Sequence, residues 1–342
     1  MKRTPVLLVL FLLTNCFFTS VRAEGQESSV TFVAVGDIML GRYIGKVMTA
    51  RSNNYPFEEV MSVLRNGDIV FGNLESIIGG HYADPYYKDK PYNFIASPSV
   101  AKTLHDAGFN ILNLANNHAM DFGPEALEET RRLLKQEEME AFGAGKDISD
   151  ARKPAIISMH GLRFGFPGYG VGHSRKAYAK WDRPGIAPIL LNDIRKDILT
   201  LRRKVDVLIV SLHWGKEYEK FPTRQQQNTA HQIIDWGADM IIGHHPHVMQ
   251  GIEIYNGKLI AYSLGNFIFD QRGNGTERSI MLVCSFRRNT FDSHEIIPID
   301  RSRNYFPRVA TGEVRKQILK EIHDISLPLN TKPGDLNKIG LH

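Results

Sequence analysis

Long apolar runs are missing from this sequence beyond its first residues. At the N-terminus, two cations precede the apolar run 5–13, and small residues around 21–23 form a cleavage site. This pattern predicts a secretory signal peptide over residues 1–23 and a polar linker over 24–29, because the run is too short and wrongly flanked to span a membrane. The protein is therefore expected to be exported, to the periplasm or the extracellular space. An uncleaved anchor and lipidation at Cys16 are the alternatives.

Cysteine is also scarce, with two residues in a chain of 342. Cys16 lies within the expected signal peptide, so export would leave Cys284 alone. A single cysteine excludes an intramolecular disulfide, and the exported chain must then depend on its hydrophobic core for stability. Cys284 stands in the apolar run IMLVCSF and is expected to be a buried, small hydrophobic residue.

The chain lacks a strong excess of either charge. Its 42 Lys and Arg residues stand against 37 Asp and Glu, which gives a formal charge of +5. Removal of the three cations in residues 1–23 would reduce +5 by three to +2. This balance gives no support to nucleic acid as a partner, and none is expected. Residues 301–342 contain several arginines and are expected to form a solvated basic extension with a helix near 313–323.

Repeats, low-complexity tracts and linkers are absent between residues 30 and 300, which predicts a single domain over 30–300. Apolar runs typical of buried strands alternate there with amphipathic segments typical of helices. The expected helices are 56–64, 99–107, 124–138, 190–203 and 222–236. The expected strands are 30–35, 68–71, 110–114, 205–212 and a short one ending at Gly243, with strand pairs over 155–167 and 252–263. This order predicts an α/β domain with a mixed sheet or two packed sheets.

Three histidines lie within four positions in the segment GHHPHV: His244, His245 and His247. They follow the short apolar strand that ends at Gly243. Strand ends of open α/β sheets are where ligand sites collect, and imidazole is the commonest protein ligand of metal ions. A single histidine is more often an ordinary surface or core residue, but three in one strand-end loop indicate a metal or phosphate-type site.

Other strands are followed by polar residues of the same chemical kind: Asp37, Glu75, Asn117 with His118, and His213. Each alone is weak evidence, because a carboxylate after a strand often caps a helix and two asparagines often form a turn. Together they are the mixed ligand set of Zn²⁺, Mn²⁺ or Fe, rather than the all-oxygen shell of Ca²⁺. A bridging carboxylate with histidines on both sides predicts one or two divalent transition-metal ions.

Six ordered motifs give the chain a resemblance to a known family. They are GDIMLGR (36–42), NLES (73–76), NNH (116–118), HWG (213–215), GHHPHV (243–248) and YSLGNFIFD (262–270). In this order they resemble the CapA family of poly-γ-glutamate capsule-synthesis proteins, which is similar in motif order to the calcineurin-like metallophosphoesterases. The match covers roughly residues 30–270. It implies a four-layer α/β/β/α sandwich with mixed sheets and a site at the strand ends.

The resemblance also implies roles for individual residues. The metal ligands that it implies are Asp37, Glu75, Asn117, His213, His245 and His247. Glu75 takes the place of the bridging carboxylate, and His118 takes the place of the general acid. His244 falls one step outside the final H-x-H pair. It is grouped with Arg42 and Asn116 as an expected substrate-binding residue.

One position departs from the phosphoesterase pattern. Those enzymes begin with D-x-H, whereas Met39 occupies the histidine position here. One metal position keeps a full set of ligands: Glu75, Asn117, His213 and His245. The other keeps only Asp37, Glu75 and His247. Because a thioether is a poor substitute for imidazole towards Zn²⁺ or Mn²⁺, we expect either a single ion or a weakly bound second one.

Three functional interpretations follow. The first is an exported hydrolase that uses a metal to cleave poly-γ-glutamate or a related anionic capsule or envelope polymer. The second is a metal-dependent phosphoesterase, which the absence of histidine at position 39 disfavours. The third is a non-catalytic accessory protein that binds polymer and assists membrane-bound synthesis or export proteins. Whether the chain is an enzyme is left open by the sequence.

Overall fold

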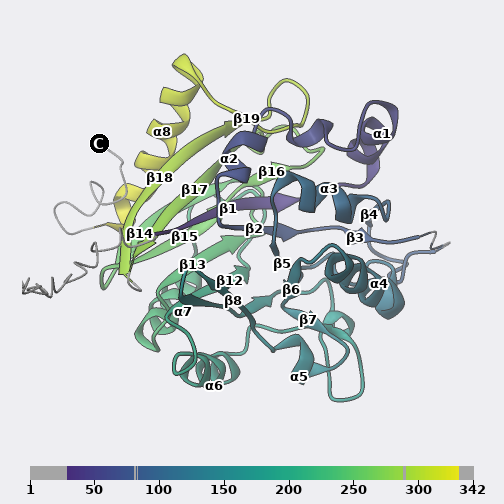
Figure 1. The fold of residues 1–342 in the computed structure, drawn as a ribbon, viewed down its shortest axis with the longest axis horizontal. Coiled ribbons are helices and arrows are strands. Elements are labelled where there is room, and N and C mark those ends of the chain that lie inside the picture. The colour runs from purple at the N-terminus through teal and green to yellow at the C-terminus, as the bar shows by residue number, and fades with distance from the viewer. Residues whose placement is uncertain (1–28, 81, 83, 288–289, 331–342) are drawn as a thin grey trace, which may run out of the picture.

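Two β-sheets packed face to face form the centre of the protein. The computed structural model describes residues 29–330, apart from 81, 83, 288 and 289. Figure 1 shows the two sheets between outer layers of helices. This mixed α/β arrangement confirms the α/β/β/α sandwich expected from the resemblance. The expected signal peptide lies outside the described residues, as does the end of the chain from residue 331.

The first sheet has eight strands, and β1 lies near its middle. Its members are β1 (Val30–Ile38), β2 (Ile69–Leu74), β5 (Ile111–Asn113), β6 (Glu140–Phe142), β16 (Asn266–Ile268), β17 (Arg278–Arg287), β18 (Thr290–Asp300) and β19 (Arg308–Val309). The order is β19-β18-β17-β1-β2-β5-β6, with β16 also paired to β1. Strands β1, β2, β5 and β6 run parallel, whereas β17 is antiparallel to β1. Cys284 in β17 is buried and free, as expected.

The second sheet has seven strands. They are β8 (Ala155–Met159), β9 (Leu162–Phe166), β10 (Gly168–Gly170), β12 (Val207–His213), β13 (Met240–His244), β14 (Met249–Tyr255) and β15 (Lys258–Leu264). The order is β14-β15-β13-β12-β9-β8, with β10 paired to β12. The hairpin between β14 and β15 turns at Asn256 and Gly257. Both have positive φ, as a two-residue turn of this kind requires. Two small sheets pair β3 (Ile77–Ile78) with β4 (Ile95–Ala96), and β7 (Ala144–Gly145) with β11 (Gly185–Ile186).

Strand β1 is apolar on both faces because both faces are covered. Phe32 and Ala34 belong to the core between the two sheets, whereas Val33 and Val35 belong to the core between the first sheet and its helices. Side chains alternate across a strand, so consecutive apolar residues serve two different cores. The same alternation recurs in β12, where Val207 faces the inter-sheet core and Leu208 faces the helices of the second sheet.

Most helices among the described residues cover the outer face of one of the two sheets, and the last of them packs against the inter-sheet core. They are α1 (Arg42–Ala50), α2 (Met61–Arg65), α3 (Val100–Ala107), α4 (Gly123–Gln136), α5 (Ile148–Ala151), α6 (Leu191–Leu201), α7 (Arg224–Asp235) and α8 (Gly312–Ser326), with short 3₁₀ turns at Tyr55–Phe57, Arg175–Ala177 and Leu327–Leu329. Helices α1 to α4 pack on the first sheet, and α6 and α7 on the second. Four of the five helices expected between residues 30 and 300 are confirmed to within a few residues, and α8 confirms the helix expected near 313–323.

The exception lies in residues 42–65. The helix expected over 56–64 is divided into the 3₁₀ turn at Tyr55–Phe57 and the short α2, because Val60 leaves the helical region at φ −125°. Helix α1 was not expected at all. Glycines at both 41 and 45 weaken its helical signal. Its apolar residues Ile44 and Met48 stabilise the helix by packing on the first sheet, which the local sequence does not reveal.

The segment after residue 300 belongs to the packed protein, which corrects the expectation of a solvated extension for residues 301–330. The buried residues Ile318, Ile322 and Ile325 of α8 join the inter-sheet core at helical spacing. The guanidinium of Arg301 is fully buried and donates to the carbonyl oxygens of Phe269 and Thr276. No helix within the described residues is long and apolar enough to cross a membrane.

Candidate metal centre

The polar residues that follow the strands meet at one edge of the two sheets. Asp37 at the end of β1 is in register with Asn73 of β2, and His213 at the end of β12 is in register with His244 of β13. Parallel strands place their carboxyl ends at the same edge, so residues distant in sequence converge there. The structure therefore brings together all six side chains expected as metal ligands.

Two groups of buried side chains at this edge have the composition of metal sites. Glu75, His213 and His245 form the first group, and Asp37, Glu75 and His247 form the second. Within each group the ligand atoms lie within 4.8 Å of one another. Glu75 belongs to both groups, which is the position expected of a bridging carboxylate.

Asn117 adjoins the first group. Its Oδ1 lies 3.0 Å from Nε2 of His213. Two ligands at right angles around one ion stand roughly 3 Å apart when each bond is about 2.1 Å. We therefore define the first metal position by Glu75, Asn117, His213 and His245, and the second metal position by Asp37, Glu75 and His247.

The carboxylate of Glu75 is buried without any hydrogen-bond partner among the described residues. Its nearest ring nitrogens are Nε2 of His247 at 3.8 Å and Nε2 of His118 at 3.9 Å. Burial and the nearby charge of Asp37 raise the pKa of Glu75 well above its ordinary value. A buried carboxylate with two orphaned oxygens costs free energy unless a cation or a proton meets it. This residue, with its imidazole neighbours, fits a divalent metal ion.

Asp37 is also fully buried, but unlike Glu75 its carboxylate accepts hydrogen bonds from the protein. Its Oδ1 accepts a hydrogen bond of 2.8 Å from Asn73, and its Oδ2 accepts one of 3.3 Å from the backbone N–H of His245. Burial alone would raise its pKa, but the imidazoles of His244 and His247, each 3.5 Å from the carboxylate, outweigh it and lower the pKa well below the ordinary value. Protein donors thus satisfy Asp37 as an anion.

The imidazoles of the centre also differ in their protonation. Burial lowers the pKa of His245 to about 3, and it lowers the pKa of His213 well below its ordinary value. Both rings are therefore neutral, which is the metal-binding form. Burial opposes protonation of His247 too, but the charges of Glu75 and Asp37 prevail and raise its pKa to about 9. A metal ion at the second position must displace that proton.

The loop that carries His245 and His247 has an unusual backbone. Both residues have positive φ, of 97° and 60°, in a region that side chains other than glycine rarely adopt. Backbone hydrogen bonds hold the loop in place, from Trp214 to the carbonyl of His244 (3.0 Å) and from Tyr218 to that of Pro246 (2.9 Å). Such strain at a site is consistent with side chains held in a fixed arrangement for function.

His118 is held by three residues that sequence reasoning missed. Its Nδ1 lies 2.7 Å from Oδ2 of Asp121, and its ring stacks on Phe94 with 3.9 Å between centroids. Lys90, buried in the loop before β4, donates to Asp121 (2.5 Å) and to the carbonyl oxygen of Asn117 (2.8 Å). Burial lowers the pKa of His118 to about 4. The H-x-x-D spacing of 118–121 was a usable signal for Asp121, but no local pattern marks Lys90.

A set of buried asparagines links the strand ends. Asn73 donates to Asp37 and accepts from the side chain of Asn113 at 2.9 Å. Asn116, expected to bind substrate, instead donates to the carbonyl of Leu74 and accepts from the N–H of His118. Its polar atoms are thus engaged inside the protein. Oδ1 of Asn266, in the expected motif YSLGNFIFD, lies 2.9 Å from Nδ1 of His247.

The other two expected substrate-binding residues lie in different settings. His244 is fully buried beside Asp37, at 3.5 Å, and against the ring of Phe71. The structure therefore places His244 behind the metal ligands, away from any surface that a substrate can reach. Arg42 is partly exposed and pairs with Asp270 at 2.8 Å while its guanidinium lies over Phe94. It stands at the rim of the centre, next to the ring that supports His118.

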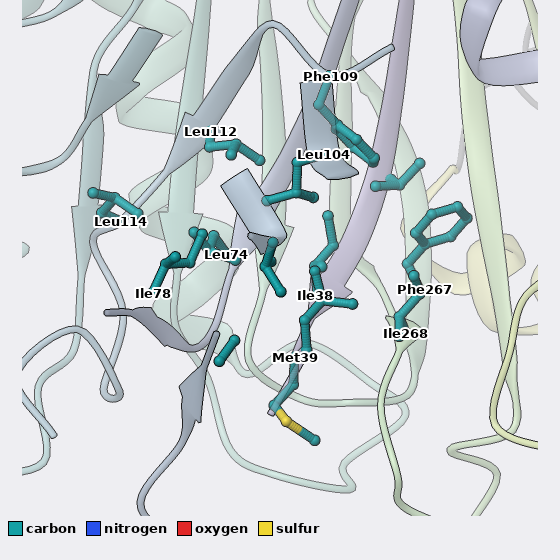
Figure 2. Close-up of a cluster of buried hydrophobic side chains, with 14 of the residues drawn as sticks. Ile38, Met39, Leu74, Ile78, Leu104, Phe109, Leu112, Leu114, Phe267 and Ile268 are labelled. Atoms are coloured by element: carbon teal, nitrogen blue, oxygen red, sulfur yellow. The ribbon is translucent and has the colours of Figure 1, made fainter. Parts of the chain in front are cut away.

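Met39 belongs to the apolar core rather than to the polar centre. Figure 2 shows it among the buried side chains between the first sheet and its helices. It is fully buried, and its sulfur accepts a hydrogen bond from the N–H of Gly41 at 3.2 Å. The second metal position is thus left with the three ligands that the sequence predicted.

Comparisons with solved structures agree with the fold. A novel phosphatase from Mycoplasma pneumoniae superposes with a TM-score of 0.53 at 13% identity, over 80% of this chain and 94% of that one. A hypothetical protein from Thermus thermophilus gives a TM-score of 0.51 at 14% identity, over 80% of this chain and 100% of that one. The chain has the fold of the calcineurin-like phosphoesterases.

Sequence comparisons are more specific. The chain is 33% identical to the "PGA biosynthesis protein CapA" of Bacillus subtilis (strain 168), over 92% of this chain and 83% of that protein. It is 32% identical to the "Capsule biosynthesis protein CapA" of Bacillus anthracis, over 80% of this chain and 68% of that protein. A "probable polyglutamine synthesis accessory protein" of Mycobacterium tuberculosis is 29% identical over 92% of this chain and 97% of its own length. The family model "Bacterial capsule synthesis protein PGA_cap" matches residues 31–271. With this match and these motifs, the chain belongs to the PGA_cap family of bacterial capsule synthesis proteins.

Proposed function

We propose that this protein is an exported, metal-dependent hydrolase that acts on poly-γ-glutamate or a related anionic capsule polymer. The names of its relatives support a role in capsule polymer synthesis. The signal peptide expected at residues 1–23 supports export, and export would place the centre where the polymer accumulates. Membrane-bound synthesis or export proteins are the partners that such a role requires.

The observation that carries this proposal is the setting of His118. Its Nδ1 faces Asp121, and its Nε2 faces Glu75 of the candidate metal centre. If Nδ1 donates to the carboxylate, Nε2 is the nitrogen left to exchange a proton with a substrate. Stacking on Phe94 fixes the ring plane and covers one of its faces. A protein that only bound polymer would have no use for a proton-transfer group held in this way.

The four ligands of the first metal position would hold a divalent transition metal, Zn²⁺, Mn²⁺ or Fe²⁺. Such an ion, when bound, supplies Lewis-acid chemistry to an amide or ester oxygen. His118, whose lowered pKa of about 4 keeps it neutral, would accept at Nε2 the proton that the attacking water releases and would pass it to the departing nitrogen of a γ-glutamyl amide. Arg42, at the rim of the centre, would bind a carboxylate of the polymer. The second metal position would hold a second ion weakly.

Incubation of the metal-loaded protein with poly-γ-glutamate, and separately with a generic phosphodiester, tests the proposal. We expect shortening of the polymer, loss of that activity in His245→Ala, and loss in His118→Asn without a change in metal content. Cleavage of the phosphodiester alone would reject the proposal in favour of a phosphoesterase.

A non-catalytic accessory role is the second candidate. It is favoured by Met39 at a position where the phosphoesterases have a ligand, and by the word "accessory" in the name of the mycobacterial relative. In that case the centre would bind polymer without cleaving it. Polymer binding by the wild type with no cleavage of either substrate, over a range of divalent metals, would favour this role over hydrolysis.

A further inference from the structure

A loop beside the centre carries unpaired positive charge. We name residues 173–183 the basic loop. Within it, Arg175, Lys176 and Lys180 are exposed, and none of them forms an ion pair with the described residues. The loop contains one acidic residue, Asp182. By contrast, Arg152 pairs with two aspartates. An unpaired cluster of this kind creates a local positive field.

The backbone of the basic loop is held firmly. The guanidinium of Arg183 donates to the carbonyl oxygens of Arg175 and Tyr178, both at 3.2 Å. The N–H of Ile148 donates to the carbonyl of Lys180 at 2.9 Å, and the side chain of Ala177, within the loop, is buried. The cations therefore project from a fixed frame, which reduces the entropy that is lost when a ligand binds.

Trp181 stands at the tip of the basic loop, and 83% of its surface is exposed. No other large hydrophobic side chain among the described residues is as exposed. Exposed aromatic rings next to cations mark binding surfaces, because the ring offers contact area to the apolar parts of a charged ligand. The methylene groups of a polycarboxylate chain are such parts.

The basic loop leads away from the candidate metal centre. The last residue of β10, Gly170, is in register with His213, and the N–H of Val171 donates to the carbonyl of His213 at 2.9 Å. The loop follows directly. The ring of His173, at its start, lies 5.2 Å from that of Tyr87, three residues before the Lys90 that holds Asp121 beside His118. The start of the basic loop therefore adjoins the segment that supports His118.

We infer that the basic loop is a second binding site for the anionic polymer, which it contacts through Arg175, Lys176, Lys180 and Trp181. This inference rests on the proposed function, because the polymer is the polyanion that the centre is proposed to handle. The ligand class is a linear polycarboxylate, whose regularly spaced charges complement the cations of the loop. The loop thus retains the chain while the centre acts on one bond.

The test measures binding of poly-γ-glutamate to the full chain with His118→Asn, which prevents turnover. In this background, Arg175→Ala/Lys176→Ala/Lys180→Ala is compared with Lys196→Ala/Arg203→Ala/Lys204→Ala. The control set removes the same charges from exposed positions that also form no ion pair with the described residues, in α6 and in the segment between α6 and β12. We expect about tenfold weaker binding in the loop variant and less than about twofold in the control. The salt dependence of binding should also become shallower in the loop variant alone.

Fluorescence gives an independent measurement. Polymer should change the emission of the parent, and Trp181→Phe should remove most of that change, because Trp214 is buried and Trp236 is partly buried against the core beside α7. Equal binding by the loop and control variants would overturn the inference and leave the proposed function standing. Failure of the parent to bind polymer at any salt concentration would instead reject the proposed function. Loop-dependent binding to vesicles of phosphatidylglycerol, with polymer binding unaffected, would make the loop a membrane contact and overturn the inference.

Discussion

The two metal positions share Glu75 but differ in how the protein treats their remaining ligands. Both oxygens of the shared Glu75 have no hydrogen-bond partner among the described residues, and at the first position Nδ1 of His245 has none either. At the second position, Asp37 accepts hydrogen bonds from Asn73 and His245, and Nδ1 of His247 faces Asn266. The first position thus keeps buried polar atoms that an ion would satisfy, whereas the second is largely satisfied by the protein itself.

This difference explains how the fold can tolerate Met39. In a centre with two equal ions, losing an imidazole would leave one ion short of ligands. Here the second position has protein donors around Asp37, which lower its pKa and stabilise its charge without an ion. From this comparison we propose that the centre is built around one tightly held ion, with Asp37 and His247 supporting its geometry.

The largest expected effect concerns the two histidines of the loop. His245→Ala should weaken binding of the tightly held ion by more than about 100-fold, because even partners outside the ligand shell contribute roughly 10–100-fold. His247→Ala should weaken it by about tenfold or less. Isothermal titration with Zn²⁺ and Mn²⁺ measures both. Equal losses in the two variants would break the distinction between the positions.

The next effect is on the stability of the metal-free protein. The pKa of His247 is raised to about 9 in the folded protein, against about 6.5 in an unfolded chain. Its contribution is therefore fully present below pH 6.5 and is lost as the pH rises through 9. Between pH 7 and 9.5 we expect this contribution to fall by about 2 kcal/mol. Urea denaturation at the two pH values measures it.

His247→Asn is the control for that prediction, because it removes the titrating ring. Its stability should fall less over the same pH interval than that of the wild type. Saturation with metal should also flatten the dependence in the wild type, because an ion at the second position displaces the proton. A wild type and variant with parallel pH profiles would show that His247 is not protonated in the metal-free centre.

The smallest expected effect is a gain of function in metal binding. Met39→His would supply the imidazole that the second position lacks, and should tighten the second ion by about tenfold. The new side chain replaces one in an apolar core, so some loss of folding stability is expected as well. Met39→Leu is the matched control, since it keeps the core apolar. If both variants bind the second ion equally, the missing imidazole is not what weakens that position.

The architecture was largely predictable from the sequence. Apolar runs ending in polar residues predicted which strand ends would meet, because parallel strands align their carboxyl ends. The alternation of strands and helices predicted the layers. Helix α1 and the packing of α8 were not predictable in the same way. Each has only a few apolar residues on one face, such as Ile318 and Ile322 in α8. These residues stabilise the helix only by packing against strands that are distant in the sequence.

The side chains that meet in the candidate centre were predictable from the sequence, but the residues that support them were not. Asp37, Glu75 and the histidines lie directly after strands, so local pattern sufficed to find them. Lys90 reaches Asp121 across 31 residues through a loop whose path no local pattern specifies. Asn116 and His244 were expected to contact substrate. The sequence does not show which residues at a strand end are covered by other parts of the protein. In the structure, the side chains of both residues are buried.

Metal stoichiometry is the most direct test of the central claim that the centre holds one ion tightly. The purified protein would be loaded with Zn²⁺ or Mn²⁺, dialysed against metal-free buffer, and analysed by inductively coupled plasma mass spectrometry, with titration of any further ion. We predict one retained equivalent per chain and a second ion at least about 100-fold weaker. Two retained equivalents with indistinguishable affinities would contradict the account.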